Sequence, residues 1–268
     1  MANAVKKHAE SEIILLRHDE DGICRLTLNR PQQYNALSEA MLDALQSAFD
    51  EIAEDKSVRV VIVAGEGKAF CAGHDLKEMR ANPSRDYYEH LFAKCGRMMT
   101  TMQRIPQPVI ARVHGIATAA GCQMVANADL AVAVRGARFA TSGIGVGLFC
   151  MTPGVALSRN LGRKHAFEML FTGEFISAEQ AVDFGLINYA VAPAELDAKV
   201  AEIAGAIAAK SQAAITAGKR VFYRQLEMDM EEAYAYAAQE MACNMMFHDA
   251  GEGIDAFIGK RKPVWKHK

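Results

Sequence analysis

The sequence predicts an α/β fold: one core in which strands alternate with helices, followed by a helical C-terminal part. Short runs of apolar, β-branched residues alternate with stretches whose apolar residues have helical spacing. The chain has 268 residues, 51% of them hydrophobic and 23% charged, which suffices for a full core. No linker rich in Ser, Gly or Pro divides it. We therefore expect a core over residues 1–200 and an attached helical subdomain over residues 201–268.

The first elements expected are a β-hairpin, a helix and a buried strand. Residues 13–17 and 23–28 are apolar runs separated by a turn-forming segment. Ser38 is placed as an N-cap, and apolar residues then recur at helical spacing up to Glu54. Residues 59–64 form a continuous β-branched run, which is typical of a strand covered on both faces. A β-α-β unit therefore begins here.

The alternation continues and then gives way to helices. The expected elements are a helix over 86–103, a strand over 108–113, a helix starting over 119–126 and a strand over 130–134. Beyond Gly154 the spacing of apolar residues is helical, and a long segment rich in Met and Tyr covers 229–247. Its apolar end, Met241 to Phe247, fits core packing or a subunit interface.

Composition excludes several classes of protein. The formal net charge is -2, so the chain has no basic field that would bind nucleic acid. The longest apolar runs fall well short of the ~18 to 20 residues that span a membrane. The first residues lack the apolar stretch of a secretory signal. The six cysteines are scattered without a C-x-x-C pair, so we expect no metal site and no disulfide framework, but reduced thiols in a cytoplasmic protein.

Two segments place small residues directly after a buried strand. The run 60–64 leads into the glycine-bearing loop that ends at His74, and the run 109–113 leads into an Ala/Gly turn that opens a helix at Ala120. Backbone N–H groups in such turns can approach a ligand closely, and the helix N-terminus adds positive potential. A pair of N–H groups from separate turns is the arrangement that stabilises an enolate or a tetrahedral oxyanion. Each turn alone also fits simple tight packing.

At these motifs the sequence resembles the crotonase superfamily, that is the enoyl-CoA hydratase/isomerase family, over nearly its whole length. Through the segment 146–154, the sequence resembles in particular the subgroup of enoyl-CoA hydratase domain-containing proteins. The residues that carry it are Leu28-Asn29-Arg30-Pro31 with Asn35-Ala36-Leu37, Ala69-Phe70-Cys71-Ala72-Gly73-His74-Asp75-Leu76, Ala119-Ala120-Gly121-Cys122, Phe171-Thr172-Gly173-Glu174, Ile176-Ser177-Ala178, Gly185-Leu186-Ile187 and Glu252-Gly253 to Lys262.

The resemblance implies a crotonase (ClpP-like) spiral of β-β-α units with a C-terminal helical trimerisation subdomain. It implies a homotrimer or a dimer of trimers that binds an acyl-CoA thioester. Coenzyme A would then enter as part of the substrate, with no covalently bound cofactor.

The resemblance also implies roles for individual residues. The backbone N–H groups of His74 and Ala120 would form the oxyanion hole for the thioester carbonyl. The coenzyme A groove would be lined by Ala36, Ala72 and Leu76, with Lys77 near the nucleotide phosphates, and Phe257 and Lys260 would reach the nucleotide of a neighbouring subunit. For each lysine taken alone, an ordinary solvated surface charge fits equally well.

The sequence departs from the family at both catalytic glutamates. A hydratase needs one group to take a proton from water and another to give one to Cα. Here the first position holds Gln123, which has no titratable group, and the second falls on Gly143. Losing such a group costs ~10²- to 10⁴-fold in rate, so ordinary hydration should be slow. Stabilisation by the oxyanion hole would remain.

Other residues are candidates for the missing proton carrier, each with a structural alternative. Cys150 is a possible nucleophile or weak acid, or a small buried hydrophobe. The His74 imidazole would point into the acyl pocket or away from it. His114 fits a structural hydrogen bond better than catalysis. The segment 78–90, with Tyr87, Tyr88 and His90, would cover the acyl chain or simply start a helix. 

The resemblance thus implies a lyase-type enzyme of fatty-acid or acyl-CoA metabolism, related to enoyl-CoA hydratases and isomerases. A non-catalytic acyl-CoA-binding protein is the main alternative, because the glutamates are missing. Thioester hydrolysis with a different proton carrier is the third.

Overall fold

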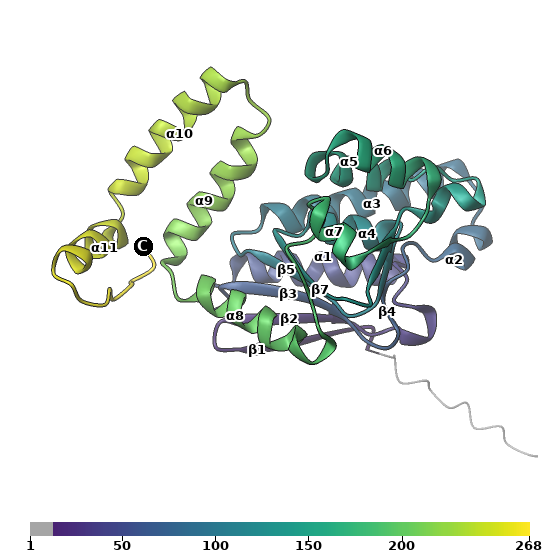
Figure 1. Ribbon diagram of the computed structural model, residues 1–268, viewed down its shortest axis with the longest axis horizontal. Coiled ribbons are helices and arrows are strands. Elements are labelled where there is room, and N and C mark those ends of the chain that lie inside the picture. Colours follow the sequence, from purple (N-terminus) through teal and green to yellow (C-terminus); the bar gives the residue numbers. More distant parts are fainter. Residues whose placement is uncertain (1–12) are drawn as a thin grey trace, which may run out of the picture.

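Residues 13–268 are described by a computed structural model, which has an α/β core and a helical arm (Figure 1). The core contains a six-stranded sheet of order β1-β2-β3-β5-β7-β10 and a four-stranded sheet of order β4-β6-β8-β9. All pairings are parallel except those of β1 with β2 and of β8 with β9. The predicted α/β class is confirmed.

The strands match the expected runs and add several short ones. Their bounds are β1 Leu15–Glu20, β2 Ile23–Leu28, β3 Val60–Gly65, β4 Ala69–Cys71, β5 Val109–Val113, β6 Ile116–Thr118, β7 Leu130–Val134, β8 Arg138–Ala140, β9 Ile176–Ser177 and β10 Tyr189–Val191. The strands of two or three residues all lie in the second sheet, except β10.

The α-helices cover the sheets and form the C-terminal arm. Their bounds are α1 Glu39–Glu54, α2 Leu76–Ala81, α3 Arg85–Arg104, α4 Ala120–Asn127, α5 Met151–Asn160, α6 Arg163–Thr172, α7 Ala178–Asp183, α8 Leu196–Ala208, α9 Gln212–Gln225, α10 Met230–Met245 and α11 His248–Ile258. Three short 3₁₀ segments are η1 Pro31–Gln33, η2 Ser142–Val146 and η3 Pro193–Glu195.

Successive chain segments contribute one strand to each sheet. The pairs β3 and β4, β5 and β6, and β7 and β8 each place a strand in the large sheet and the next strand in the small one. A helix follows after each pair. This repeat is the predicted spiral of β-β-α units, and its turns stack so that the loops after β4 and β6 become neighbours.

Local sequence explains the core elements. All six residues of β3 are buried, as expected of a central parallel strand. The Ser38 hydroxyl caps α1 by accepting a hydrogen bond from the Met41 amide. The apolar face of α1 is then buried against the sheet, with Leu45, Phe49 and Ile52 fully or almost fully enclosed.

The arm starts later than the predicted boundary at residue 200, which falls inside α8. Helix α8 packs on β3, β5 and β7, and its Val200 and Ala204 are fully buried. It therefore belongs to the core, because helical spacing alone does not reveal which helix covers the sheet. Ser211 then caps α9, which leads away from the core (Figure 1).

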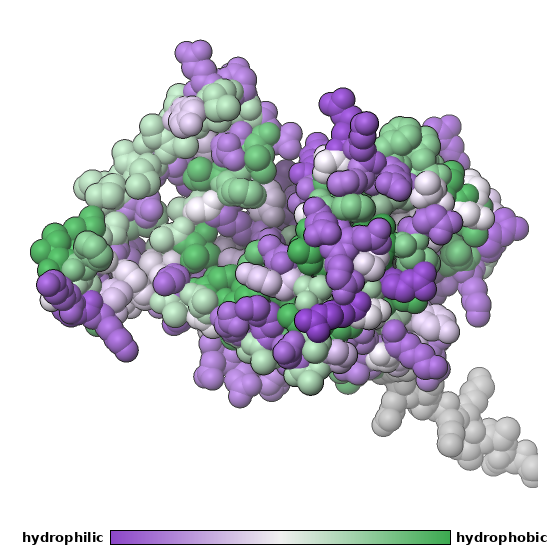
Figure 2. Space-filling view, viewed as in Figure 1, coloured by the Kyte–Doolittle hydropathy of each residue, from purple (hydrophilic) through white to green (hydrophobic). Residues whose placement is uncertain are grey.

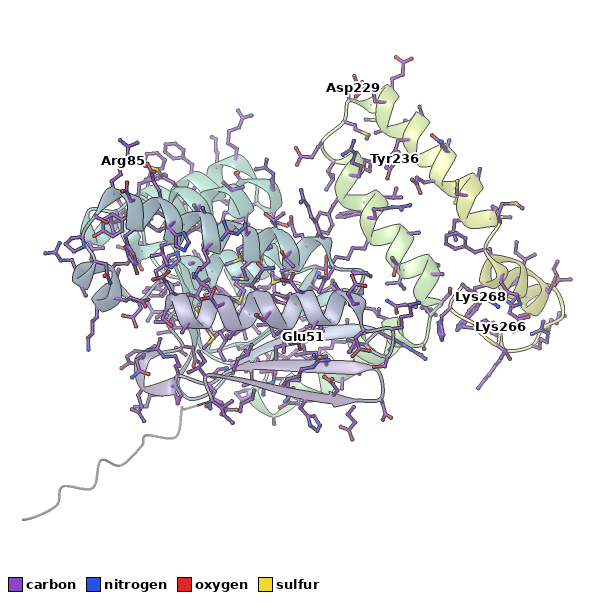
Figure 3. The ribbon with its side chains drawn as sticks, turned by 180° about the vertical axis from the view of Figure 1, so that it is seen from behind. Glu51, Arg85, Asp229, Tyr236, Lys266 and Lys268 are labelled. Atoms are coloured by element: carbon purple, nitrogen blue, oxygen red, sulfur yellow. The ribbon has the colours of Figure 1, made fainter. Side chains whose placement is uncertain are left out.

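The arm formed by α9, α10 and α11 has little core of its own. In α9 and α10 no residue is buried, and α11 buries only Asp249 and Ala256. Figure 3 shows Asp229 at the far tip of the arm and Lys266 and Lys268 at its other end. Large apolar side chains are exposed along it, and Figure 2 shows hydrophobic surface there: Phe222, Leu226, Met230, Tyr234, Met241, Met245, Met246, Ile254, Phe257 and Ile258.

Within residues 13–268, every helix is too short or too polar to cross a membrane.

Candidate active site

The two turns singled out in the sequence lie against each other. Gly73, in the turn after β4, has a φ of +87°, a conformation that favours glycine. A Cβ added to it would lie 2.8 Å from the Ala119 Cβ and 3.1 Å from the Ala120 nitrogen. The absence of a side chain at Gly73 therefore lets the His74 turn approach the start of α4.

The amides of His74 and Ala120 are left available by the surrounding hydrogen bonds. Leu37 forms a parallel bridge with His74, in which the Leu37 amide donates to the Gly73 carbonyl (2.7 Å) and the Leu37 carbonyl accepts from the Asp75 amide (3.3 Å). In this pattern the N–H of His74 itself faces away from Leu37. Ala120 is the first residue of α4, and such an amide has no acceptor within its own helix.

The start of α4 is held in an unusual conformation. Ala119 precedes the helix with a φ of +50°, which is strained for a residue with a Cβ. Its amide donates to the Ala140 carbonyl (3.0 Å), which fixes the turn on β8. Gly121 lies directly on β4, because an added Cβ would be 2.1 Å from the Cys71 carbonyl oxygen. These contacts direct the N-terminus of α4 toward the His74 turn.

A third segment, residues 34–37, completes the surroundings of these turns. The fully buried Asn35 side chain donates to the carbonyls of Glu66 and Ala69, both at 2.8 Å. The Ala72 amide donates to the Tyr34 carbonyl (3.0 Å). These hydrogen bonds bring Ala36 and Ala72 beside the turns that carry His74 and Ala120. The anchoring role of Asn35 was missed from the sequence, since its partners are about 30 positions away.

The remaining residues assigned to the coenzyme A groove divide into two groups. Leu76 and Lys77 begin α2 directly after the His74 turn, and both are exposed. Phe257 lies at the end of α11 and Lys260 two residues beyond it, and α11 is on the opposite side of the molecule from α2 (Figure 1). Phe257 is 86% exposed. These two residues do not contact the groove of their own chain.

Gln123 stands one turn into α4, on the same face as Ala120. It is 5% exposed, and its Oε1 is buried without a hydrogen-bond partner among the described residues. An unpaired buried acceptor costs ~1 to 3 kcal/mol, so this oxygen marks a place where a ligand or water would bind.

Gly143 lies in η2, and its surroundings exclude a side chain. An added Cβ would lie 2.5 Å from the Leu148 carbonyl oxygen and 2.8 Å from the Cys150 Sγ. The Leu148 amide donates to the Gly143 carbonyl (2.9 Å) and holds the loop in this position. Cys150 is 7% exposed, and burial raises the pKa of its thiol. The loop thus fills the space next to position 143, which no sequence pattern had indicated.

The His74 side chain packs under α3. Its ring meets the Phe92 ring edge-on, with 5.5 Å between centroids. Burial lowers the pKa of the imidazole, and the Leu37 backbone partly opposes this shift. Neither ring nitrogen has a hydrogen bond of good geometry among residues 13–268. The lowered pKa favours the neutral ring.

Two further candidates have structural contacts. His114 Nε2 lies 2.9 Å from the Gly67 carbonyl oxygen, in agreement with its expected structural hydrogen bond. In the segment 78–90 the Tyr88 hydroxyl donates to the Met79 carbonyl (3.1 Å), and α3 begins at Arg85. The Tyr87 hydroxyl is buried without a partner in the described chain.

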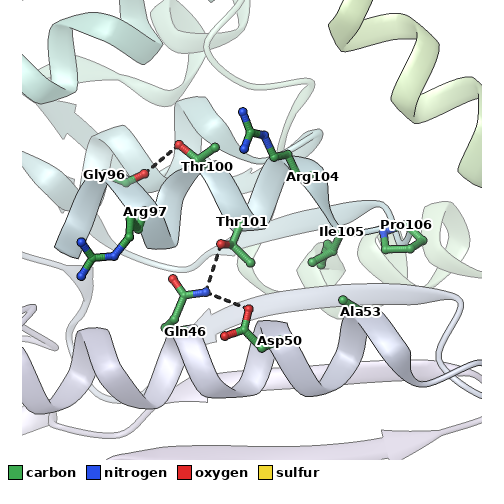
Figure 4. Close-up of a pocket in the computed structure, with 10 residues that line it drawn as sticks. All are labelled: Gln46, Asp50, Ala53, Gly96, Arg97, Thr100, Thr101, Arg104, Ile105 and Pro106. Carbon is green, nitrogen blue, oxygen red and sulfur yellow. Dashed lines mark hydrogen bonds between the residues drawn. The ribbon is translucent and has the colours of Figure 1, made fainter. Parts of the chain in front are cut away.

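Two surface cavities lie away from these residues. One, of about 850 Å³, is a groove between α1 and α3 that includes Gln46, Thr101 and Arg104 (Figure 4). The other, of about 690 Å³, separates the end of α1 from α9. Neither cavity is lined by a residue of the two turns that carry His74 and Ala120. The two turns that carry His74 and Ala120, rather than a cavity, therefore define the candidate site. 

The family model for enoyl-CoA hydratase/isomerase matches residues 18–268. The chain belongs to this family. Among solved structures, an enoyl-CoA hydratase from Mycobacterium smegmatis is 64% identical, with a TM-score of 0.94 over 95% of this chain and 99% of that one. The human enoyl-CoA hydratase domain-containing protein 3 is 46% identical, with a TM-score of 0.92 over 94% and 100%. Both the family and the crotonase fold are thus as predicted.

Curated relatives add a correction. Enoyl-CoA hydratase domain-containing protein 3 of Xenopus laevis is 46% identical over 97% of this chain and 88% of that protein, and its name places it in mitochondria. The proteins of the same name in mouse, human and zebrafish are also named mitochondrial. The expectation of a cytoplasmic protein is therefore wrong. It rested on the scattered cysteines, which indicate a reducing compartment but do not distinguish one such compartment from another.

Proposed function

We propose that this protein binds an acyl-CoA thioester and stabilises the enolate or oxyanion form of its carbonyl with the amides of His74 and Ala120. The observation that carries the proposal is the packing of Gly73 against Ala119 and Ala120, which puts the His74 and Ala120 N–H groups on adjacent turns, outside the Leu37 bridge and the α4 helix bonds. Donors fixed in advance at a developing negative charge supply ~3 to 4 kcal/mol each to such reactions.

Ordinary hydration of an enoyl-CoA is not the reaction that the site favours. Hydration requires proton transfer to and from water, and neither Gln123 nor Gly143 has a titratable group. The His74 ring, whose pKa is lowered by burial, packs edge-on against Phe92. We therefore place the activity among enolate-forming reactions of acyl-CoA metabolism that use another proton carrier.

A non-catalytic acyl-CoA-binding protein is the second candidate. The observation that favours it is the filled space beside Gly143, which leaves no room for an acid in that position. The free amides would then contribute affinity alone.

We also propose that the arm assembles the chain into a trimer or a dimer of trimers. Its exposed apolar side chains, such as Met241, Met245 and Phe257, need a covering surface. Because α11 lies far from α2 in its own chain (Figure 1), Phe257 and Lys260 would contact the nucleotide bound to another subunit.

The test combines binding and turnover. Purified protein is titrated with acetyl-CoA, butyryl-CoA and crotonyl-CoA by calorimetry, and loss of the conjugated thioester absorbance of crotonyl-CoA is followed separately. We expect all three esters to bind and crotonyl-CoA to be hydrated at least ~100-fold more slowly than by a family member with both glutamates. Rapid hydration would contradict the proposed division between oxyanion stabilisation and acid/base catalysis. Absence of binding would contradict the acyl-CoA assignment itself.

A further inference from the structure

The thiol of Cys150 lies where a side chain of residue 143 would begin. The Sγ atom is 2.8 Å from the ideal Cβ position of Gly143, closer than non-bonded atoms approach a Cβ in proteins. A glutamate at this position would overlap with the sulfur in its first side-chain atom. The thiol and the Leu148 carbonyl therefore occupy space that a glutamate side chain would need.

Cys150 is also close to the rest of the candidate site. Helix α5, which begins directly after Cys150, packs on α4, the helix that carries Ala120 and Gln123. Ser142, next to Gly143, shares a hydrogen bond with Thr118 (2.7 Å between the hydroxyl oxygens). Thr118 stands two residues before Ala120, so η2 and the oxyanion turn are linked directly.

An independent observation indicates an unfilled polar position in the same region. Only 5% of Gln123 is exposed, yet its Oε1 accepts no hydrogen bond from any described residue. Gln123 lies on the same face of α4 as Ala120, three residues further along the helix. A ligand held by the Ala120 amide would approach Gln123 on one side and the η2 loop on the other.

We propose that Cys150 lines the acyl end of the site, with its sulfur facing the α-carbon of a bound acyl-CoA thioester. The inference rests on the proposed function and adds a specificity-determining residue to it. It also explains why position 143 is glycine: the thiol replaces the second carboxylate in space rather than leaving a gap. Restoring a glutamate at 143 alone would force η2 to move instead of restoring a hydratase.

Bromoacetyl-CoA tests this position, since its reactive carbon is the α-carbon of a thioester. The Cys150 sulfur would attack that carbon, a C–S bond would form, the C–Br bond would break with loss of bromide, and the thiol proton would pass to the buffer. Peptide mass spectrometry of the full-length protein then shows which cysteine carries the CoA thioacetyl group. Iodoacetamide, which lacks the CoA portion, serves as the undirected reagent.

We expect Cys150 to be labelled by bromoacetyl-CoA about tenfold or more faster than by iodoacetamide, because binding raises the local concentration of the reagent. Saturating acetyl-CoA should prevent that labelling. Cys95, which is fully buried in the core, is the internal control and should stay unlabelled by both reagents. The Cys150→Ala variant should lose the labelled peptide.

The outcomes separate the inference from the function on which it rests. If bromoacetyl-CoA stabilises the protein against heating but Cys150 stays unlabelled, or is labelled without protection by acetyl-CoA, the position assigned to the thiol is wrong and acyl-CoA binding stands. If no CoA ester stabilises the protein or protects any cysteine, both the proposed function and this inference are overturned.

Discussion

At the scale of single residues, the account depends on a few glycines and alanines whose lack of side chains brings backbone groups together. Gly73, Gly121 and Gly143 each face a backbone atom so closely that a Cβ would overlap with it or with a neighbouring side chain. In contrast, Gly96 in α3 has no atom near the position of an added Cβ. Sequence alone does not distinguish these two kinds of glycine, because the contacts come from residues far along the chain.

Substituting Gly73 tests the close approach of the two turns. Gly73→Ala places a Cβ 2.8 Å from the Ala119 Cβ at a φ of +87°, and we expect it to lower the free energy of unfolding by ~1 to 3 kcal/mol. It should also abolish acyl-CoA binding, because the His74 amide is displaced. Urea denaturation and calorimetric titration measure both effects.

Gly96→Ala is the matched control. It lies within α3 in open space, so the change should leave binding intact and raise stability by up to ~1 kcal/mol through helix propensity. Equal behaviour of the two variants would show that the contact at Gly73 has no special importance.

At the scale of elements, the long periodic segments were predictable and the short strands were not. The sequence predicts α1, β3, β5 and β7 from local spacing, and the structure has them within a few residues. Strands β4, β6, β8 and β9 have only two or three residues each, and their pairing with distant segments defines them. The local sequence of these strands therefore does not predict the second sheet. The turns that carry the His74 and Ala120 N–H groups directly follow β4 and β6, and their sequence signal is the run of small residues there rather than a strand pattern.

The attachment of α9 to the core is polar rather than apolar. The Lys219 ammonium, 7% exposed, contacts the Asp129 carboxylate (2.7 Å) and donates to the Gln107 carbonyl (2.9 Å). The Tyr223 hydroxyl donates to the other oxygen of Asp129 (2.7 Å). Such directional contacts fix the angle at which the arm leaves the core.

Removing one partner of this buried pair should destabilise the protein strongly. Lys219→Met leaves the Asp129 charge without its cation, and we expect a loss of ~3 kcal/mol in the free energy of unfolding. Faster hydrogen exchange in α9 should accompany the loss. Lys199→Met, which removes an i,i+3 surface pair with Glu202, serves as the control and should cost at most ~1 kcal/mol. If both variants lost the same small amount, the pair would not fasten the arm.

The C-terminal tail, residues 259–268, should detach from α11 in acid. Two hydrogen bonds from Arg261 and one from the Val264 amide lower the pKa of Glu252 to about 2, against ~4.3 in an unfolded chain. A depressed pKa stabilises the folded tail above the unfolded value, and this stabilisation is lost as pH falls from ~4.3 toward 2.

Trp265, the single tryptophan, lies against Gly253 and reports on the tail. Its fluorescence should change across that pH interval. In Glu252→Gln the tail should already be loose at pH 7, whereas Glu227→Gln, at an exposed pair with Arg159, should behave as the wild type. A Glu252→Gln protein with the wild-type acid profile would disprove the role of this carboxylate.

At the scale of the whole molecule, the arm exposes many large apolar side chains, and contiguous apolar surface on a protein marks an interaction site. The sequence left open whether Met241 to Phe247 belong to a core or to an interface. In this chain Met241, Met245 and Met246 are exposed, which favours the interface. Sequence pattern cannot settle such a question, because a helix face looks the same whether its own chain or another copy covers it.

Sedimentation velocity tests the assembly. We expect the wild type to sediment as a trimer or a dimer of trimers and Met246→Asp to shift toward the monomer, because Met246 is 85% exposed in one chain and its burial by another would desolvate the new charge. The circular dichroism of the variant should be unchanged. Glu227→Lys, near the tip of the arm, serves as a charge-changing control. A wild type that sediments as a monomer would remove the proposed shared nucleotide site.

The most direct test is a crystal structure with a bound, unreactive acyl-CoA analogue such as butyryl-CoA. The account predicts that the thioester oxygen accepts hydrogen bonds from the backbone nitrogens of both His74 and Ala120, at about 2.7 to 3.2 Å. A thioester bound elsewhere, or with its oxygen turned away from these two nitrogens, would contradict it.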